Sequence, residues 1–136
     1  MVAIESDPKI AAVYEKLHPE DDVFVEDAHS LLLDVFDQFD FIWSSPPCQS
    51  HSAMARANSR TSPKYPEMDL YQQIIFLQTY YKGHWVVENV KPYYKPLIPP
   101  TCVVGRHYFW SNFPIVAKDV ARPANFINVQ NLKLTN

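Results

Sequence analysis

The chain has 136 residues, of which 47% are hydrophobic and 14% aromatic, and its formal net charge is -3 at pH 7. This composition excludes a disordered chain, and the length suits one globular domain. No apolar run is long enough to cross a bilayer and no secretion signal is found, which predicts a cytoplasmic protein without a membrane partner. Cys48 and Cys102 are the only cysteines. They favour reduced thiols over a disulfide scaffold, and without a metal-ligand pattern around them no metal site is expected.

The charges are divided unevenly along the chain. Residues 1–45 hold 11 acidic and 2 basic side chains, whereas residues 46–136 hold 4 acidic and 10 basic ones. The division could arise by chance, with both sets of charges on solvent-exposed faces. Alternatively, the basic second part could face a polyanion such as nucleic acid. The change of sign falls beside Cys48.

Strand-like and helix-like segments alternate along the first 90 residues. Short apolar runs predict strands at residues 2–6, 22–27, 39–45 and 84–90. Helical spacing of apolar residues predicts helices within residues 7–19, 29–39 and 67–83. In the first helix Asp7 can act as the cap, Pro8 suits the first helical position, and Ile10, Val13, Tyr14 and Leu17 share one face.

This alternation predicts an α/β fold with a mostly parallel sheet, right-handed crossovers and helices on both faces. Residues 46–66 are expected to form a long polar loop and residues 91–100 an extended proline-rich segment. Residues 105–113 alternate well enough for a strand or a hairpin arm. We therefore expect one domain over residues 1–113, followed by an irregular tail over residues 114–136.

A chemically capable side chain follows each of the four predicted strands. In chain order these side chains are Glu5, Asp27, Cys48 and Glu88. Parallel α/β sheets bind ligands beyond the carboxyl ends of their strands, so we expect Cys48 and Glu88 to project into one cleft. Taken singly, each has a simpler interpretation, as a helix cap, a surface carboxylate or a packed thiol.

Four segments resemble motifs of the DNA cytosine-5 methyltransferase family. "PPCQS" at 46–50 is similar to the family's proline–cysteine–glutamine motif, and "VVENV" at 86–90 to its glutamate–asparagine–valine motif. "AIESDPKIAAVYEKLHP" at 3–19 resembles the second motif, and "VEDAHSL" at 25–31 the third. The resemblance covers about residues 2–113 and implies a partial Rossmann-like, S-adenosylmethionine-dependent methyltransferase fold.

The resemblance also implies a role for each site residue in DNA methylation of the restriction–modification kind. Cys48 would attack C6 of a flipped cytosine while Glu88 hydrogen-bonds N3, and Asn89 would orient the loop that carries the cysteine. Arg106 would correspond to the arginine of the eighth motif. The residues that would hold S-adenosylmethionine are Glu5, Asp27, Ala28 and Pro47. The residues that would contact double-stranded DNA are Gln49, Ser50, Arg56, Arg60 and Lys64.

Several segments of the family are not found in the chain. Gly83 and Gly105 are its only glycines, so the glycine-rich segment of the family is missing, together with the first strand, the target recognition domain and the final helix. The chain could be a fragment, one piece of a split enzyme, or a reduced relative that binds DNA or a partner without methylating. A second polypeptide or a second copy could supply the first strand. Without it, the strands at 2–6 and 39–45 should either pair directly or leave open edges. The isolated chain should then be inactive in methylating DNA and should not be a stable monomer.

Functions of other classes are also open. "SSPP" at 44–47 resembles the motif of methyltransferases that act on exocyclic amino groups, but Cys48 stands where those enzymes have an aromatic residue. A cysteine hydrolase with His51 as its base is disfavoured, because no third orienting group is evident. The alternative from a different class is a non-catalytic DNA-binding or assembly protein that retains the fold.

Overall fold

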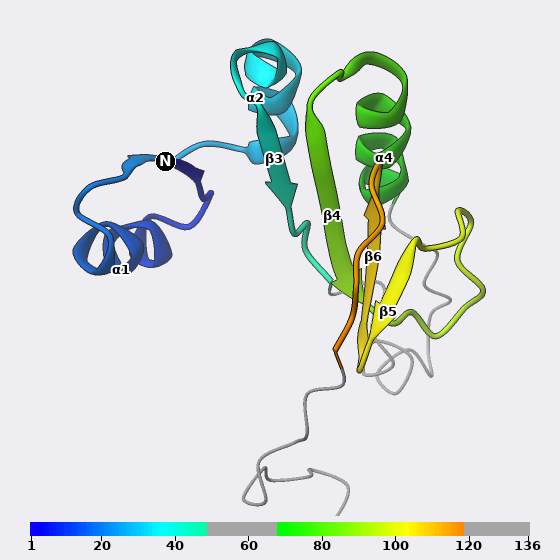
Figure 1. Cartoon of the computed structure of the whole chain (residues 1–136). Helices are drawn as coiled ribbons and strands as arrows, with labels where there is room; N and C mark the ends of the chain where they lie inside the picture. The colour runs from blue at the N-terminus through cyan, green and yellow to red at the C-terminus, as the bar shows by residue number, and fades with distance from the viewer. Residues whose placement is uncertain (49–67, 119–136) are drawn as a thin grey trace, which may run out of the picture.

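The structure is a computed structural model, and it describes residues 1–48 and 68–118, which form an α/β arrangement (Figure 1). The elements in chain order are β1 (Val2–Ile4), α1 (Pro8–Leu17), β2 (Asp22–Phe24), α2 (Ala28–Val35), the 3-10 turn η1 (Phe36–Gln38), β3 (Phe41–Ser44), α4 (Met68–Tyr80), β4 (His84–Val90), β5 (Cys102–Val104) and β6 (His107–Ser111). Within the described ranges, no helix combines the length and the apolar character needed to cross a membrane.

Hydrogen bonds divide the strands into two sheets, a pair β1–β2 and a four-stranded sheet in the order β3–β4–β6–β5. The pairs β1–β2 and β3–β4 are parallel, whereas β4–β6 and β5–β6 are antiparallel. The four-stranded sheet is therefore mixed, which differs from the expected mostly parallel arrangement. Part of the reason is local: Gly105 adopts a φ of 57° in the tight turn between β5 and β6, which reverses the chain.

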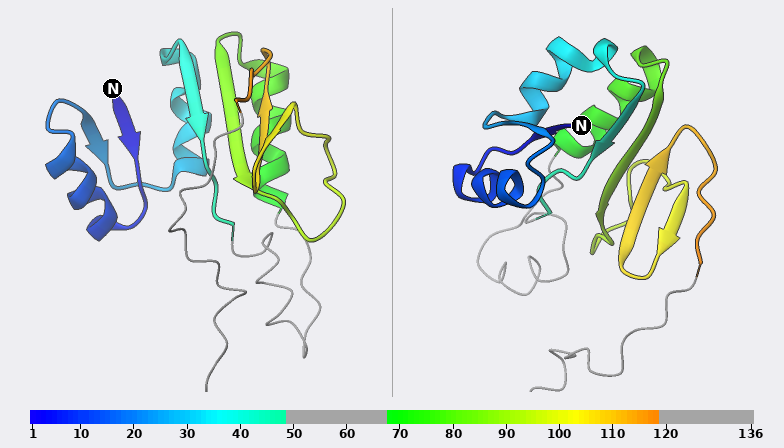
Figure 2. Two further views of the ribbon diagram at one scale, coloured as in Figure 1. Left: turned by 60° about the horizontal axis from the view of Figure 1, so that its bottom comes forward. Right: turned by 60° about the vertical axis from the view of Figure 1, so that its left-hand side comes forward.

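Among residues 1–48 and 68–118, the strands β1 and β3 are each paired on one side only, so each presents an open edge. Figure 2 shows β1, not β2, on the side of β3, with both arrows pointing in the same direction. Of the two outcomes expected for the first and third predicted strands, the structure therefore has the open edges and not direct pairing.

The helix α1 begins as predicted but does not bury its apolar face. The carboxylate of Asp7 caps the helix by accepting from the backbone N–H of Lys9 at 2.8 Å. Ile10, Val13 and Leu17 are each more than half exposed, and Ala11 is the one buried residue of the helix. The β1–α1–β2 unit therefore leaves much of its apolar surface uncovered.

The hydrophobic core lies between α4 and the four-stranded sheet. Its buried members are Leu70, Tyr71, Ile74, Leu77, Tyr81, Trp85, Val87 and Trp110. Leu32 of α2 and Phe36 of η1 pack against the same cluster, so α2 and α4 cover the same face of this sheet. On the opposite face the side chains of Phe41 and Trp43 are about half exposed, so the described residues do not provide the expected cover on both faces.

A buried glutamine joins three elements of this core. Gln73 of α4 accepts a hydrogen bond from the Ser44 hydroxyl of β3 at 2.6 Å, and its amide nitrogen lies 3.2 Å from Nδ1 of His29 in α2. Nearby, Tyr81 donates to the carbonyl of Phe39 at 2.6 Å, and burial raises the pKa of this tyrosine. These bonds hold β3 against the two helices by polar contacts as well as by packing.

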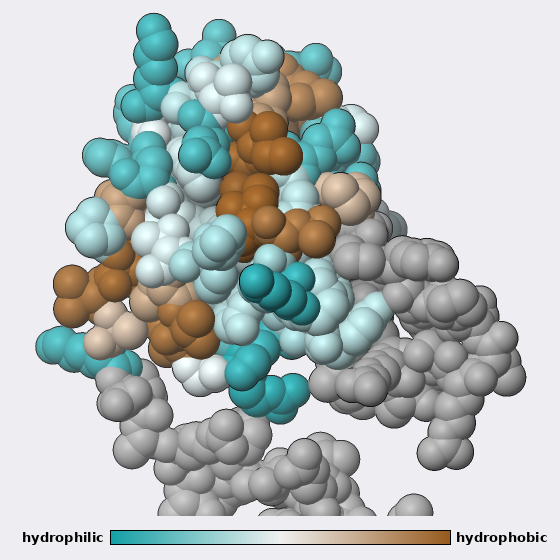
Figure 3. All heavy atoms as spheres, turned by 90° about the vertical axis from the view of Figure 1, so that its right-hand side faces the viewer, coloured by the Kyte–Doolittle hydropathy of each residue, from teal (hydrophilic) through white to brown (hydrophobic). Residues whose placement is uncertain are grey.

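Apolar side chains also gather on the outer surface of the molecule. Figure 3 shows a strip of hydrophobic residues on the face that carries α4 and the segment leading to β5. The exposed apolar residues of these parts include Met68, Ile75 and Leu97. The helix α4 is thus buried on one side and partly apolar on the other.

Replacing Leu77 by alanine should lower the free energy of unfolding by about 2–5 kcal/mol, because Leu77 is 0% exposed and its removal leaves a cavity in the core. The measurement is a urea titration followed by circular dichroism. Replacing Ile75, which lies two residues away in the same helix and is 55% exposed, is the matched control and should change the stability far less. Equal losses in the two variants would contradict the packing described above.

Candidate functional site

The carboxyl ends of β3 and β4 lie at the same edge of the sheet, because the two strands are adjacent and parallel. Ser44 pairs with Val87, so the next residues, Ser45 and Glu88, lie side by side at this edge. Cys48 follows three residues after Ser45 and is exposed, with a free thiol. That the side chains of Cys48 and Glu88 share one cleft stays a prediction.

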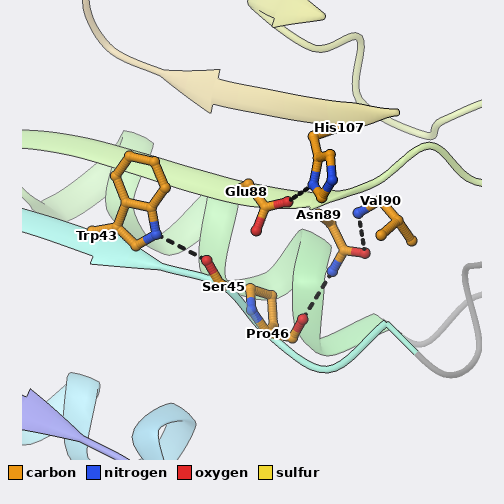
Figure 4. A network of polar contacts seen from close by, with 7 residues as sticks. All are labelled: Trp43, Ser45, Pro46, Glu88, Asn89, Val90 and His107. Carbon is orange, nitrogen blue, oxygen red and sulfur yellow. Dashed lines mark hydrogen bonds and ion pairs between the residues drawn. The ribbon is translucent and has the colours of Figure 1, made fainter. Parts of the chain in front are cut away.

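Asn89 ties β4 to the segment that leads to Cys48 (Figure 4). Its amide nitrogen donates to the carbonyl of Pro46 at 3.0 Å, and its amide oxygen accepts from the backbone N–H of Val90 at 2.9 Å. The residue is only 2% exposed, so both bonds lie in a dry environment and are costly to lose. Asn89 therefore fixes the backbone two residues before the cysteine.

The carboxylate of Glu88 is held by a histidine from the neighbouring strand. Figure 4 shows Oε1 of Glu88 in contact with Nδ1 of His107, which belongs to β6. Glu88 pairs with Phe109 and Val90 with His107, so the two side chains project from the same face of the sheet. Sequence reasoning missed His107, because the alternation in "HYFWS" predicts a strand but not its partner or its register.

Aromatic rings flank Glu88 on this face. The centroids of Trp43 and Phe109 lie 6.1 Å apart at a steep angle, and the indole N–H of Trp43 donates to the Ser45 hydroxyl at 2.8 Å. Trp43 pairs with Val86 and Phe109 with Glu88, which places both rings beside the carboxylate. The two rings therefore border the Glu88–His107 pair with apolar surface.

Arg106 lies at the same edge as Glu88. It is exposed in the turn between β5 and β6, and its carbonyl accepts from the backbone N–H of Lys91 at 2.7 Å, immediately after β4. The structure therefore brings Arg106 close to the end of β4 in space, although 17 residues of sequence separate Glu88 from it.

The two predicted cofactor carboxylates follow β1 and β2, which are also adjacent and parallel. Glu5 accepts from the backbone N–H of Asp7 at 2.9 Å. Asp27 caps α2 by accepting from the backbone N–H of Ser30 at 3.0 Å and from its hydroxyl at 2.6 Å, and these donors hold the pKa of Asp27 below its usual value. Asp27 therefore makes the bonds of a helix cap, whereas Glu5 bonds the backbone of Asp7, which is itself the cap of α1. Ala28, the first residue of α2, and Pro47 are exposed.

The predicted DNA contacts lie outside the described residues. They are Gln49, Ser50, Arg56, Arg60 and Lys64, and the same applies to His51 of the hydrolase interpretation. These assignments stay predictions.

One group of possible metal ligands is found within the described ranges, at the start of β2. Ligand atoms of His18, Glu20 and Asp21 lie within 4.8 Å of one another. Asp21 already accepts from the Tyr14 hydroxyl at 2.9 Å and pairs with the amino group of Met1 at 2.9 Å, and these donors lower its pKa. The group lies at the amino end of β2, away from the edge with Glu88.

The comparison with known families agrees with the geometry of this edge. The family model described as C-5 cytosine-specific DNA methylase matches residues 1–96, which include the elements from β1 to β4 with Cys48, Glu88 and Asn89. No curated protein sequence matches the chain. The matched segment is more than half of the chain, and the chain therefore belongs to the C-5 cytosine-specific DNA methylase family.

Proposed function

We propose that the chain is the catalytic part of a DNA cytosine-5 methyltransferase with a partial Rossmann-like fold. The observation that supports this most strongly is the placement of Cys48 and Glu88 after adjacent parallel strands, with Asn89 bonded to the segment before the cysteine. A nucleophile and an acid at one sheet edge are what addition to a pyrimidine ring requires. The substrate is a cytosine flipped out of double-stranded DNA.

The chemistry begins with the thiolate of Cys48, which forms a bond to C6 of the cytosine. The electrons of the C5–C6 double bond shift into the ring as Glu88 transfers a proton to N3, and C5 becomes nucleophilic. S-adenosylmethionine, when bound, supplies the methyl group that C5 takes. The hydrogen on C5 then leaves as a proton to a base, the C6–S bond breaks, and the thiolate departs while N3 returns its proton to Glu88.

The carboxylates of Glu5 and Asp27 fit the adenosine half of S-adenosylmethionine. Carboxylate oxygens accept hydrogen bonds from ribose hydroxyls and from the adenine amino group, and both residues follow adjacent strands at one sheet edge. The methionine half would need a glycine-rich backbone cradle, and Gly83 and Gly105 are the only glycines of the chain. We therefore propose that this chain provides only part of the cofactor site.

We also propose that a segment outside these 136 residues, from the same gene product or from a different polypeptide, supplies a strand between β1 and β3. The open edges of both strands face the same region, and unpaired edges template the addition of another strand. The exposed apolar residues Ile10, Val13 and Leu17 of α1 provide surface that such a partner would cover. A second copy is a weaker choice, because it has no glycine-rich segment to contribute.

The isolated chain is therefore expected not to be a stable monomer. Light scattering at micromolar concentration should give a mass well above the 15.8 kDa of one chain, because open edges and uncovered apolar residues associate. A sharp peak at the mass of one chain would contradict the need for a partner. A well-defined dimer would instead assign the added strand to a second copy.

The catalytic proposal can be tested without the cofactor. Attack on C6 with proton transfer to N3 lets C5 take a proton from water and lose its own hydrogen, and no methyl donor takes part. The full chain should therefore release tritium from DNA that contains 5-tritiated cytosine, although it transfers no labelled methyl group on its own. DNA binding without tritium release would contradict the catalytic proposal and favour the non-catalytic alternative.

A further inference from the structure

We propose that His107 is a positioning residue that determines which carboxyl oxygen of Glu88 carries the acid proton. The inference rests on the proposed function, since it concerns the proton that Glu88 transfers to cytosine N3. Its structural basis is the contact between Nδ1 of His107 and Oε1 of Glu88.

Both side chains are held by strands and not by loops. β4 and β6 are paired over five residues, and the pairs Glu88–Phe109 and Val90–His107 place the histidine diagonally across from the glutamate. The Glu88 side chain is 17% exposed and that of His107 is 50% exposed, so the carboxylate is the more enclosed partner. The contact is therefore built into the sheet register, which makes the carboxylate orientation rigid.

A protonated carboxyl group has one carbonyl oxygen and one hydroxyl oxygen. The contact with His107 determines which oxygen of Glu88 is which. When Nδ1–H of His107 donates to Oε1, this oxygen must be the carbonyl oxygen, and the acid proton is then carried by Oε2. Figure 4 shows the second oxygen pointing away from His107, toward the side on which Ser45 and Pro46 lie. This is the side of the segment that leads to Cys48.

The same hydrogen bond remains useful after the proton has moved. Transfer from Oε2 to N3 leaves Glu88 as a carboxylate, and Nδ1–H of His107 still donates to Oε1 and stabilises the new charge. The proton returns to Oε2 when the thiolate leaves, so His107 neither gains nor loses a proton over the reaction. The opposite arrangement, in which Nδ1 accepts from a proton on Oε1, would direct the acid proton away from the base.

Nitrogen-15 spectra of the histidine-labelled full chain test the tautomer directly. The signal of His107 is identified by its loss in the His107→Asn variant. We expect His107 to carry its proton on Nδ1, and we expect Glu88→Ala to shift it to the Nε2–H form that a free imidazole prefers. An Nε2–H tautomer in the wild-type chain, or a tautomer unaffected by Glu88→Ala, would overturn the proposal.

Tritium release from 5-tritiated cytosine tests the consequence for the reaction. His107→Phe should lower the rate about 10- to 100-fold, the effect of losing a hydrogen bond to a charged group. His107→Asn should stay close to the wild-type rate, because the amide nitrogen of asparagine takes the place of Nδ1. His84→Leu, at the far end of the same face of β4, is the matched control and should leave the rate unchanged. Circular dichroism verifies that each variant is folded.

The proposal fails if His107→Phe is as active as the wild type, or if His107→Asn loses as much activity as His107→Phe. In the first case the contact would have no effect on the reaction, and in the second the donor on Nδ1 would not be the cause. Absence of tritium release by the wild-type chain would contradict the proposed function. The nitrogen-15 spectra would then still show whether His107 donates a hydrogen bond from Nδ1 to Glu88.

Discussion

Replacing Cys48 by alanine should abolish tritium release from 5-tritiated cytosine. The proposed reaction begins with a bond between sulfur and C6, and alanine has no group that can form it. C5 then never becomes nucleophilic, whatever the state of Glu88. Release should be measured at saturating DNA, so that a change in DNA affinity does not hide the chemical step.

Cys102→Ala is the matched control for this variant. Cys102 is also a free thiol, but it lies in β5 and is partly buried. Its replacement should leave tritium release unchanged. Persistent release by the Cys48 variant would exclude the covalent route, and loss of release in both variants would indicate a general effect on folding.

Glu88→Gln should lower the rate of tritium release by about 100- to 10,000-fold, the usual contribution of a general acid. Glutamine has nearly the same shape, and its amide oxygen can still accept from His107. It has no acidic proton to transfer to N3, so negative charge accumulates on the ring as the thiolate attacks. The variant therefore removes proton transfer and keeps the packing.

Glu15→Gln, on the exposed surface of α1, is the control for the change of charge. It should match the wild type. A Glu88→Gln variant that keeps most of its activity would mean that N3 receives its proton from another group, and the Glu88–His107 pair would then have only a structural role.

Local elements could be predicted well from the sequence. β4 has the predicted bounds, residues 84–90, because an apolar run follows a glycine and ends at Lys91. Asp7 caps α1 as expected, because a short acidic side chain followed by proline is a local pattern. β1 ends at Ile4, earlier than predicted, because Glu5 turns back to accept from the N–H of Asp7.

Features that depend on distant parts of the chain could not be predicted. The spacing of Ile10, Val13 and Leu17 shows that they share a face of α1, but it does not show what covers that face. In the structure these three residues stay more than half exposed among the described residues. The antiparallel pairing of β4 with β6 joins residues about 20 positions apart. Its register alone brings His107 to Glu88, and register has no signature within either strand.

The exposed apolar residues of the β1–α1–β2 unit have a consequence for how stability is distributed over the molecule. The strand β4 is buried and is paired on both sides. Its amide protons should therefore exchange only when the whole domain unfolds. The β1–α1–β2 unit, with Ala11 as its one buried residue, should open locally at a much smaller free energy. Glu5 directly follows β1 in this unit, whereas Glu88 and Asn89 belong to β4. The binding free energy of a ligand or partner on the β1–α1–β2 unit must therefore offset the entropy lost when this unit becomes ordered, whereas the proposed site at the end of β4 is already rigid.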